Sequence, residues 1–444
     1  MKRRLKMKPD SKKHRELIVE AQNYIWSHAE TGYKEWQTHK YMKDAFEKLG
    51  YEVTEAGNVP GFYTVIDTGR EGPELLVLAE LDSLICFDHP DANKETGAVH
   101  CCGHSAQCAA MVGIAAGLKE EGALDGLSGR IRLCLVPAEE LIEIEYRNEL
   151  KKQGVIKYFG GKPEFLSRGY FDSVDLAFMI HTSAGGVFAT RTGSNGCVAK
   201  KIIYKGKSAH AGGAPWNGRN ALYAATAGIN AANALRETFK EDDMIRFHPI
   251  LTAGGSAVNA IPETAVLESY VRGATFDAIL SANKNINRAL VSGALAIGCD
   301  VEIVDNPGYA PLNNDRGMIN AYLDAVKELG YDATVYETRT PSSTDMGDLS
   351  VVMPVVHPYC PGASGTSHGA DYYINNPDLA CVTSADLQLI MINLLLANGA
   401  ERAKEIVGNF TPLYSKEEYL KLMDSIASEG SRIEYTETEA KIRL

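Results

Sequence analysis

The chain has 444 residues, of which 45% are hydrophobic and 23% are charged, and its formal net charge at pH 7 is −12. This balance is typical of a globular protein with sizeable buried cores and excludes disordered and collagen-like chains. Because an acidic surface repels a phosphate backbone, we expect no nucleic-acid partner. At roughly 100–200 residues per domain, the length predicts two or three domains.

Targeting signals and cysteine usage favour the cytoplasm. Residues 1–8 are basic, like the start of a signal peptide, but polar residues follow from Pro9 where an apolar region would be needed. The uncharged apolar stretch 109–118 is far shorter than the ~20 residues that span a bilayer. The nine cysteines, an odd number, form no disulfide framework. We therefore expect a cytoplasmic protein with no membrane partner and a frayed tail at residues 1–8.

Helical and extended patterns alternate over the first 190 residues. The expected helices span 11–30, 39–49 and 106–121, and the expected strands span 75–79, 131–136 and 174–180. This alternation predicts an α/β fold with a mostly parallel sheet flanked by helices. Ligands of such sheets bind at the carboxyl ends of the strands.

The order of elements changes between about Arg191 and Asn306. The predicted strand, helix, two strands, helix and strand span 198–205, 220–239, 244–253, 266–272, 276–297 and 299–304. This order matches a ferredoxin-like sandwich, which turn-forming residues bracket at both ends. Helix and strand patterns resume at 317–329, 348–356 and 384–398. We therefore predict a discontinuous first domain, 1–190 and 307–444, with a second domain inserted at 191–306.

Cys102 and His104 share a tight loop directly before a predicted helix. The thiolate and the imidazole are both metal ligands, and Gly103 between them lets the backbone fold so that both point at one ion. Taken alone, the pair is more typical of a helix-capping loop that happens to hold two small polar side chains. Other ligands must therefore converge on this loop.

Further candidate ligands follow the predicted strands. Glu139 and Glu140 come after the strand 131–136, and adjacent glutamates there point in different directions, so one can ligate a metal while the other handles a proton. A solvated charged turn is the alternative. His181 ends the next strand, and His368 lies in a glycine-rich loop of the C-terminal third. Together with Cys102 and His104, these residues form a coherent set for Zn²⁺ or a similar transition ion.

Longer motifs occur in a fixed order along the chain. They lie at residues 27–35, 78–84, 102–104, 139–140, 181, 206–222, 254–262, 272 and 343–350. In this order they resemble the metal-dependent amidohydrolases of the aminoacylase, indole-acetyl-amino-acid hydrolase and aminobenzoyl-glutamate hydrolase type. Two features depart from the family. Ser105 stands where Asp is usual, and the stretch 143–170 is longer and more charged than expected, which could reshape the substrate pocket.

The resemblance implies a role for each matching residue. The metal ligands of the family's cysteine-containing branch match Cys102, His104, Glu140, His181 and His368. Glu139 matches the general base, and Asp82 matches the carboxylate that orients a ligand histidine. The residues that meet the substrate, in family members often across a dimer, match His210, Asn259 and Arg272. The resemblance also implies one or two divalent ions per subunit, Zn or Mn, and a homodimer made through a lid or dimerisation domain at 191–306.

The favoured hypothesis is a hydrolase that cleaves the amide bond of an N-acyl amino acid, an aminobenzoyl-glutamate-like conjugate or a dipeptide. The metal would activate water, with Glu139 as the general base. Arg272 would clamp a substrate carboxylate, while Asn259 and His210 would donate to the developing oxyanion.

Two alternatives remain at this point. A cysteine hydrolase would use Cys101 or Cys102 with His104, but it leaves both glutamates and the other histidines without a role. A non-catalytic carboxylate-binding protein would be favoured if a metal ligand or Glu139 were missing, and none is missing.

Overall fold

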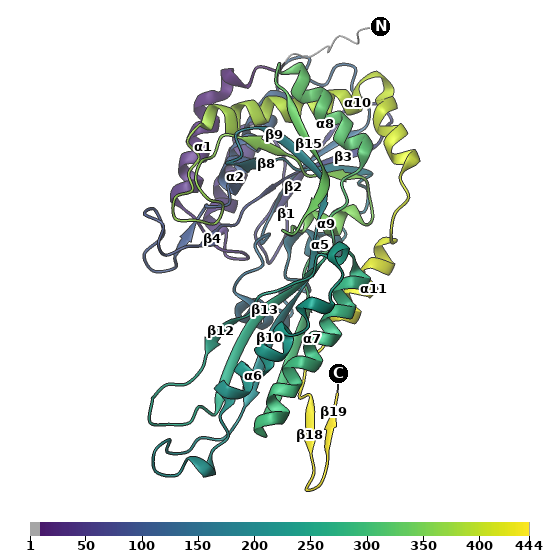
Figure 1. Ribbon diagram of the computed structural model, residues 1–444. Helices are drawn as coiled ribbons and strands as arrows, with labels where there is room; N and C mark the ends of the chain where they lie inside the picture. The colour runs from purple at the N-terminus through teal and green to yellow at the C-terminus, as the bar shows by residue number, and fades with distance from the viewer. Residues whose placement is uncertain (1–8, 444) are drawn as a thin grey trace.

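The computed structural model describes residues 9–443, so the tail predicted at residues 1–8 lies outside the described part of the chain. Figure 1 shows an upper body of helices around sheets and an elongated lower body. Helix α11 (Lys416–Ile426) lies between the two bodies.

A six-stranded sheet forms the centre of the upper body. Its strands, in spatial order, are β1 (Thr54–Glu55), β2 (Phe62–Asp67), β6 (Arg130–Val136), β3 (Glu74–Glu80), β7 (Leu176–Phe178) and β16 (Val355–Val356). The strands from β6 to β16 run parallel, whereas β1 and β2 are antiparallel at one edge. Every residue of β3 is buried, as expected for a parallel strand with helices on both faces. The mostly parallel α/β sheet predicted from the sequence is confirmed.

Helix α3 (His104–Leu118) lies in the core of the upper body, and all of its residues are buried. Small residues make this burial possible. A Cβ at Gly113 would lie 2.7 Å from Ile18 of α1 (Arg15–Ser27) and 2.8 Å from Ala385 of α10 (Ser384–Asn409), so only glycine allows these helices to approach so closely. Two further helices, α2 (Trp36–Lys48) and α8 (Arg316–Glu328), contribute to the same hydrophobic cluster.

A second sheet of four strands lies beside the first. Its order is β15 (Ala333–Thr340), β9 (Phe188–Ser194), β17 (Tyr359–Pro361) and β8 (His181–Ser183). The sequence patterns do not predict β15, because this edge strand is largely exposed and its polar residues form no apolar run. The predicted strand 174–180 is shortened to β7, and the chain then enters β8 at His181.

The lower body has the predicted order of strands and helices. Its elements are β10 (Gly196–Lys205), α6 (Ala221–Asn233), β11 (Arg246–Phe247), β12 (Ile250–Ala253), β13 (Thr264–Gly273), α7 (Phe276–Ile297) and β14 (Asp300–Pro307). The antiparallel sheet has the order β11, β13, β10, β14, with β12 also paired to β13. Helix α7 has the predicted bounds, because Thr275 caps its start and Gly298, at a φ of 72°, ends it. The single strand predicted at 244–253 is instead divided into β11 and β12.

The C-terminal segment passes from the upper body to the lower one. After α10 and α11, the hairpin β18 (Ile433–Tyr435) and β19 (Ala440–Ile442) lies beside the lower body (Figure 1). Ile433 packs in the hydrophobic cluster of that body, and Ser428 pairs with Asp305 of β14. The smaller elements are β4 (Leu84–Ile85), β5 (Ala98–Val99), α4 (Ile144–Lys152), α5 (Gly161–Ser167) and α9 (Met346–Ser350).

Helix α10 and the turn before it are the most apolar part of the structure. The segment Asp378–Asn409 is long and apolar enough to cross a membrane by composition, but 78% of its apolar window is buried inside the fold. The helix is interrupted at Ala397–Ala400, where the backbone leaves helical geometry. Its apolar composition therefore matches its place in the core between α3 and α8.

Candidate metal centre

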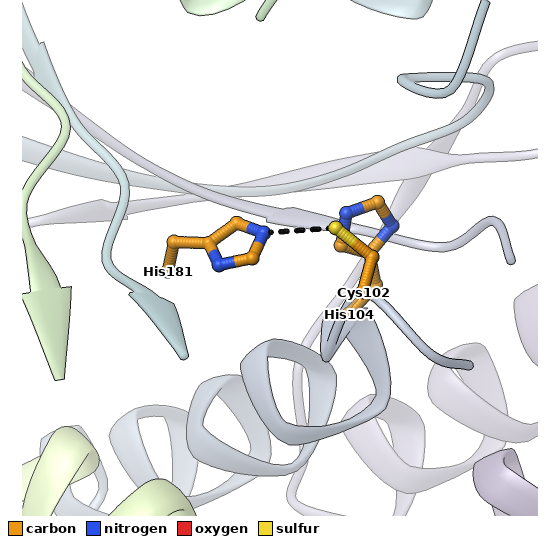
Figure 2. Close-up of side chains that lie close together, drawn as sticks. All are labelled: Cys102, His104 and His181. Atoms are coloured by element: carbon orange, nitrogen blue, oxygen red, sulfur yellow. Dashed lines mark hydrogen bonds between the residues drawn. The ribbon is translucent and has the colours of Figure 1, made fainter. Parts of the chain in front are cut away.

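The candidate ligands lie on separate segments that meet at the carboxyl edge of the main sheet. The ligand atoms of Cys102, His104 and His181 all lie within 4.8 Å of one another (Figure 2). The same limit holds for Cys102, Glu140 and His368. The structure thus brings together all five residues for which the sequence predicted metal ligation, and Cys102 belongs to both groups.

His104, which is buried, and His181, which is half-buried, both direct Nε2 into the site. The Nδ1 atom of His181 lies 2.7 Å from the carbonyl oxygen of Thr182, and the Nδ1 atom of His104 lies 2.9 Å from that of Asp82. Each carbonyl can accept from Nδ1–H, so that Nε2 of the neutral ring is free to bind a metal. Figure 2 shows the His181 ring directed at Cys102, whose Sγ lies 3.3 Å from Nε2. Burial lowers the pKa of His181 to about 3, so this imidazole is neutral, as a metal ligand must be.

The two glutamates leave their strand in different directions. Ala138 before them has a φ of 58°, a left-handed conformation that turns the chain sharply, and its N–H donates to Glu35 at 2.8 Å. Glu140 then lies with Cys102 and His368, whereas Glu139 lies within 4.8 Å of Glu80 and His104. The geometry therefore agrees with the expectation that the two carboxylates do different work.

Hydroxyl groups from the lower body and the segment after it hold this turn. Tyr309 donates to the carbonyl of Glu139, and Tyr270 on β13 donates to the carbonyl of Leu141. Burial raises the pKa of Glu139 well above its ordinary range, and the charges of Glu80 and Glu140 raise it further. A cation bound beside it opposes both effects.

Asp82 lies behind His104, as predicted for the residue that orients it. Its Oδ1 lies 3.4 Å from Nδ1 of His104, and its Oδ2 accepts the N–H of Glu140 at 2.8 Å. Asp82 thus holds the His104 ring through its carbonyl oxygen and the segment that carries Glu140 through its carboxylate.

Several buried polar atoms of the site lack a hydrogen-bond partner. They include Nε2 of His104, Oε1 of Glu140 and Oδ1 of Asp82. Burying such atoms unpaired is costly, and a bound cation would remove the cost for the first two. A thiolate, imidazoles and a carboxylate form a donor set that suits a divalent transition ion. The residues therefore fit the metal that the sequence predicts.

A cavity of about 470 Å³ opens onto this site. Its lining includes Cys102, Glu139, Glu140, His181 and His368 from the upper body, and Arg272 from β13 of the lower body. Nη1 of Arg272 donates to the hydroxyl of Ser343 at 3.0 Å. Arg272 therefore lies in the wall of the cavity that the candidate ligands share, and its contact with the substrate stays a prediction.

His210 and Asn259 lie outside this cavity. Both side chains are exposed, and they lie on adjoining loops of the lower body, where Ala211 N–H donates to the carbonyl of Asn259 at 2.9 Å. The structure brings these two residues to each other but not to the metal ligands of the same chain. This placement leaves their predicted catalytic roles dependent on domain closure or on a second subunit.

Glu80 and Lys162 support the site and are absent from the predicted set. Lys162 is completely buried, and its Nζ lies 2.6 Å from Glu80, whose other carboxylate oxygen lies 3.2 Å from Nε2 of His104. Lys162 also pairs with buried Asp345. A glutamate at the end of an apolar run was a visible signal for Glu80, whereas a lysine in a charged stretch gives no sign of burial.

The stretch 143–170 lies behind the metal site, contrary to the expectation that it could reshape the pocket. None of its residues lines the cavity in the part of the chain that the structure describes. It instead contributes Lys162 from α5 and Arg147 from α4, both buried. Arg147 donates to the carbonyls of Phe159, at 2.7 Å, and of Glu140. The extra charged residues therefore brace the ligand loop from within.

Replacing Cys102 by alanine is expected to lower metal occupancy, because Cys102 belongs to two of the ligand groups. Elemental analysis of the purified protein measures this directly. The control is Cys86→Ala, which removes a half-buried thiol outside those groups. Unchanged metal content in Cys102→Ala would show that this thiolate is not a ligand.

Comparisons with known proteins agree with this site. The sequence profile of peptidase family M20/M25/M40 matches residues 77–391. The human Xaa-Arg dipeptidase is 29% identical over 374 residues, covering 78% of this chain and 77% of its own. A p-aminobenzoyl-glutamate hydrolase chain of Escherichia coli is 25% identical over 324 residues, covering 71% of this chain and 63% of its own.

A solved structure gives the same fold. The dinuclear metal-binding M20 peptidase of Bacillus subtilis superposes with a TM-score of 0.63 at 20% identity, covering 87% of this chain and 99% of its own. The family profile alone spans more than half of the 444 residues. The chain therefore belongs to peptidase family M20/M25/M40, which confirms the metal-dependent hydrolase predicted from its sequence.

Proposed function

We propose that the protein hydrolyses the amide bond of a small N-acyl amino acid, aminobenzoyl-glutamate-like conjugate or dipeptide. The observation that carries this proposal is that the five candidate metal ligands cluster, and that four of them line one cavity together with Glu139 and Arg272. A carboxylate that lies beside the ligands but in a different group suits a general base.

Each residue of the site has a separate role in the proposed reaction. A divalent ion held by the ligand set would polarise the amide carbonyl and increase the acidity of water. Glu139 takes the proton of the attacking water and delivers it to the leaving nitrogen. Arg272 binds the substrate carboxylate through charge-assisted hydrogen bonds. The hydroxyls of Tyr309 and Tyr270 fix the turn that carries Glu139, so its carboxylate is positioned before the substrate binds.

The names of the relatives support this reaction class. One is a Xaa-Arg dipeptidase and another a p-aminobenzoyl-glutamate hydrolase, so both names describe cleavage at an amino-acid amide. A cysteine hydrolase finds less support. Burial raises the pKa of the Cys102 thiol well above its ordinary range, and without a metal this thiol is a poor nucleophile.

The test is a panel of N-acyl amino acids, p-aminobenzoyl-glutamate and β-alanyl dipeptides incubated with protein loaded with Zn²⁺ or Mn²⁺. We expect amide cleavage that a chelator abolishes and that added metal restores. Cleavage that survives complete metal removal but is lost on thiol alkylation would instead identify the cysteine hydrolase. Comparing the two loaded forms shows which ion supports turnover, and elemental analysis of the protein as purified shows whether zinc or manganese is resident and whether one or two ions bind.

We also propose that the protein is a cytoplasmic homodimer, made through the lower body at 191–306, in which His210 completes the partner's site. Six large apolar side chains on this body are exposed, and four of them have an exposed fraction above 60%. These four are Trp216 (78%), Tyr223 (64%), Ile250 (61%) and Val258 (102%). A concentration of exposed apolar residues favours an interface, and these belong to the segments around His210 and Asn259.

Complementation tests this dimer. We expect His210→Ala and Glu139→Gln to be inactive separately and to regain part of the activity when mixed, because one site of the mixed dimer holds both native residues. Native mass spectrometry verifies that mixed dimers form. If they form and stay inactive, His210 does not act across the interface.

A further inference from the structure

The cavity contains a second arginine for which the proposed reaction has no use. Arg191 on β9 lines the same cavity as Arg272. Its guanidinium stacks over the ring of Tyr336, with Cζ 4.3 Å from the ring centroid. Within residues 9–443 the guanidinium donates no hydrogen bond and forms no ion pair, and the Arg191 carbonyl accepts from the side chain of Asn314.

Arg339, a neighbouring arginine, has a structural role that Arg191 lacks. Arg339 on β15 donates to the side chain of Asn313 at 2.8 Å and to the carbonyls of Ser194 and Leu312. Arg339 therefore ties the β15 strand to the loops beside it. Arg191 is half-buried and has no such hydrogen-bonded partner, so its N–H groups are free to bind a ligand in the cavity.

The sheet register places Arg191 on the side of the metal ligands. Tyr359 of β17 pairs with His181 of β8 on one side and with Ala189 of β9 on the other. Paired residues point to one face, and residues two apart in a strand share that face, so Arg191 faces the same way as His181. Two strand spacings separate their strands, roughly 10 Å. A small ligand bound at the metal ligands can therefore reach Arg191.

The charged side chains that line the cavity lie in two separate regions. The only carboxylates among the cavity residues in the described chain are Glu139 and Glu140, both at the metal site. The remainder of the polar lining is neutral or cationic. It comprises Arg191 and Arg272, three histidines, two cysteines, one amide and several hydroxyls, among them Asn314, Thr340, Ser342 and Ser343. Arg191, which donates no hydrogen bond, and Arg272, which donates to the Ser343 hydroxyl, give this wall two positive charges, and these match a ligand with two negative groups.

We propose that the preferred substrate is an amide that carries two carboxylates, of which Arg272 binds one and Arg191 the other. This inference rests on the proposed function and names the substrate class for it. Arg191 is then a specificity-determining residue. The same wall disfavours a substrate with a basic side chain, such as the arginine in the name of the human relative, because guanidiniums repel one another.

Binding to the metal-loaded Glu139→Gln protein, measured by calorimetry, tests this proposal without turnover. The probes are N-acetyl-L-glutamate and N-acetyl-L-glutamine, which differ in one charge and hardly in shape. In a second pair, N-succinyl-L-leucine and N-succinamoyl-L-leucine, the carboxylate and the amide that replaces it lie on the acyl side. We expect the dianion of at least one pair to bind tenfold or more tightly than its neutral counterpart, and the pair that shows this locates the second carboxylate.

When Arg191→Gln is introduced into the Glu139→Gln protein, the affinity for the dianion alone should fall, so that the ratio of the two affinities approaches one. Arg191→Lys should retain part of the preference. The matched control is Arg316→Gln, which removes an exposed arginine outside the cavity and should leave the affinity for every probe unchanged. Equal affinity within both pairs, or equal weakening of both members by Arg191→Gln, would overturn the proposal. If the wild-type protein cleaves no amide but the Arg191-dependent preference persists, the proposed reaction fails and this inference stands.

Discussion

Replacing Glu139 by glutamine is expected to lower kcat by about 10²–10⁴-fold, the range over which general-base assistance operates. The amide has nearly the same shape as the carboxylate but cannot accept the proton of water. Glu139 lies outside the two groups that contain Cys102, although with Glu80 and His104 it forms a third group that could hold a cation. The metal content, measured by elemental analysis, should therefore remain close to that of the wild type while turnover is lost.

Glu140→Gln is the matched control for this prediction. Glu140 lies with Cys102 and His368, and Oε1 of Glu140 lies 3.5 Å from Nε2 of His368, so its loss should reduce metal occupancy together with activity. A loss of metal in Glu139→Gln equal to that in Glu140→Gln would show that the roles of the two residues have been exchanged.

The sequence predicted those parts of the fold and site that depend on local patterns. Continuous apolar runs identified β3 and β6, because a strand buried on both faces has no polar alternation. The polar residues directly after such runs were recognised for the same reason, and they include the Glu139 and Glu140 pair. Helix α7 was predicted at its observed bounds because its cap and its terminal glycine lie next to a clear helical period.

Features that depend on distant partners could not be predicted in this way. Strand β15 owes its place to pairing with β9, and its exposed residues resemble those of a loop. The C-terminal hairpin packs on the lower body through Ile433, although the sequence placed it with the first domain. Arg191 gave no signal at all, because an arginine in a strand becomes informative only when the structure shows which groups surround it.

Lys162 also depends on distant partners, and we expect its replacement to have the largest effect on stability among the variants considered. Its ammonium is completely buried between Glu80 and Asp345, which are also buried. Burial lowers the pKa of Lys162, but the charges of Asp345 and Glu80 outweigh this effect and keep the pKa above its ordinary value. The lysine is therefore charged at neutral pH, and it neutralises two carboxylates that are also close to His104 and Glu139.

Lys162→Met should destabilise the protein by about 3–5 kcal/mol, because it leaves buried carboxylates without a cation. The control is Lys157→Met from the same stretch, whose exposed pair with Asp424 at 2.9 Å should contribute no more than about 1 kcal/mol. Thermal unfolding of the metal-free proteins measures the difference. Because Asp345 is one of the two carboxylates left unpaired, Lys162→Met/Asp345→Asn should recover part of the loss. If Lys162→Met unfolds at the same temperature as Lys157→Met, the buried cation is not what holds Glu80 beside the metal ligands.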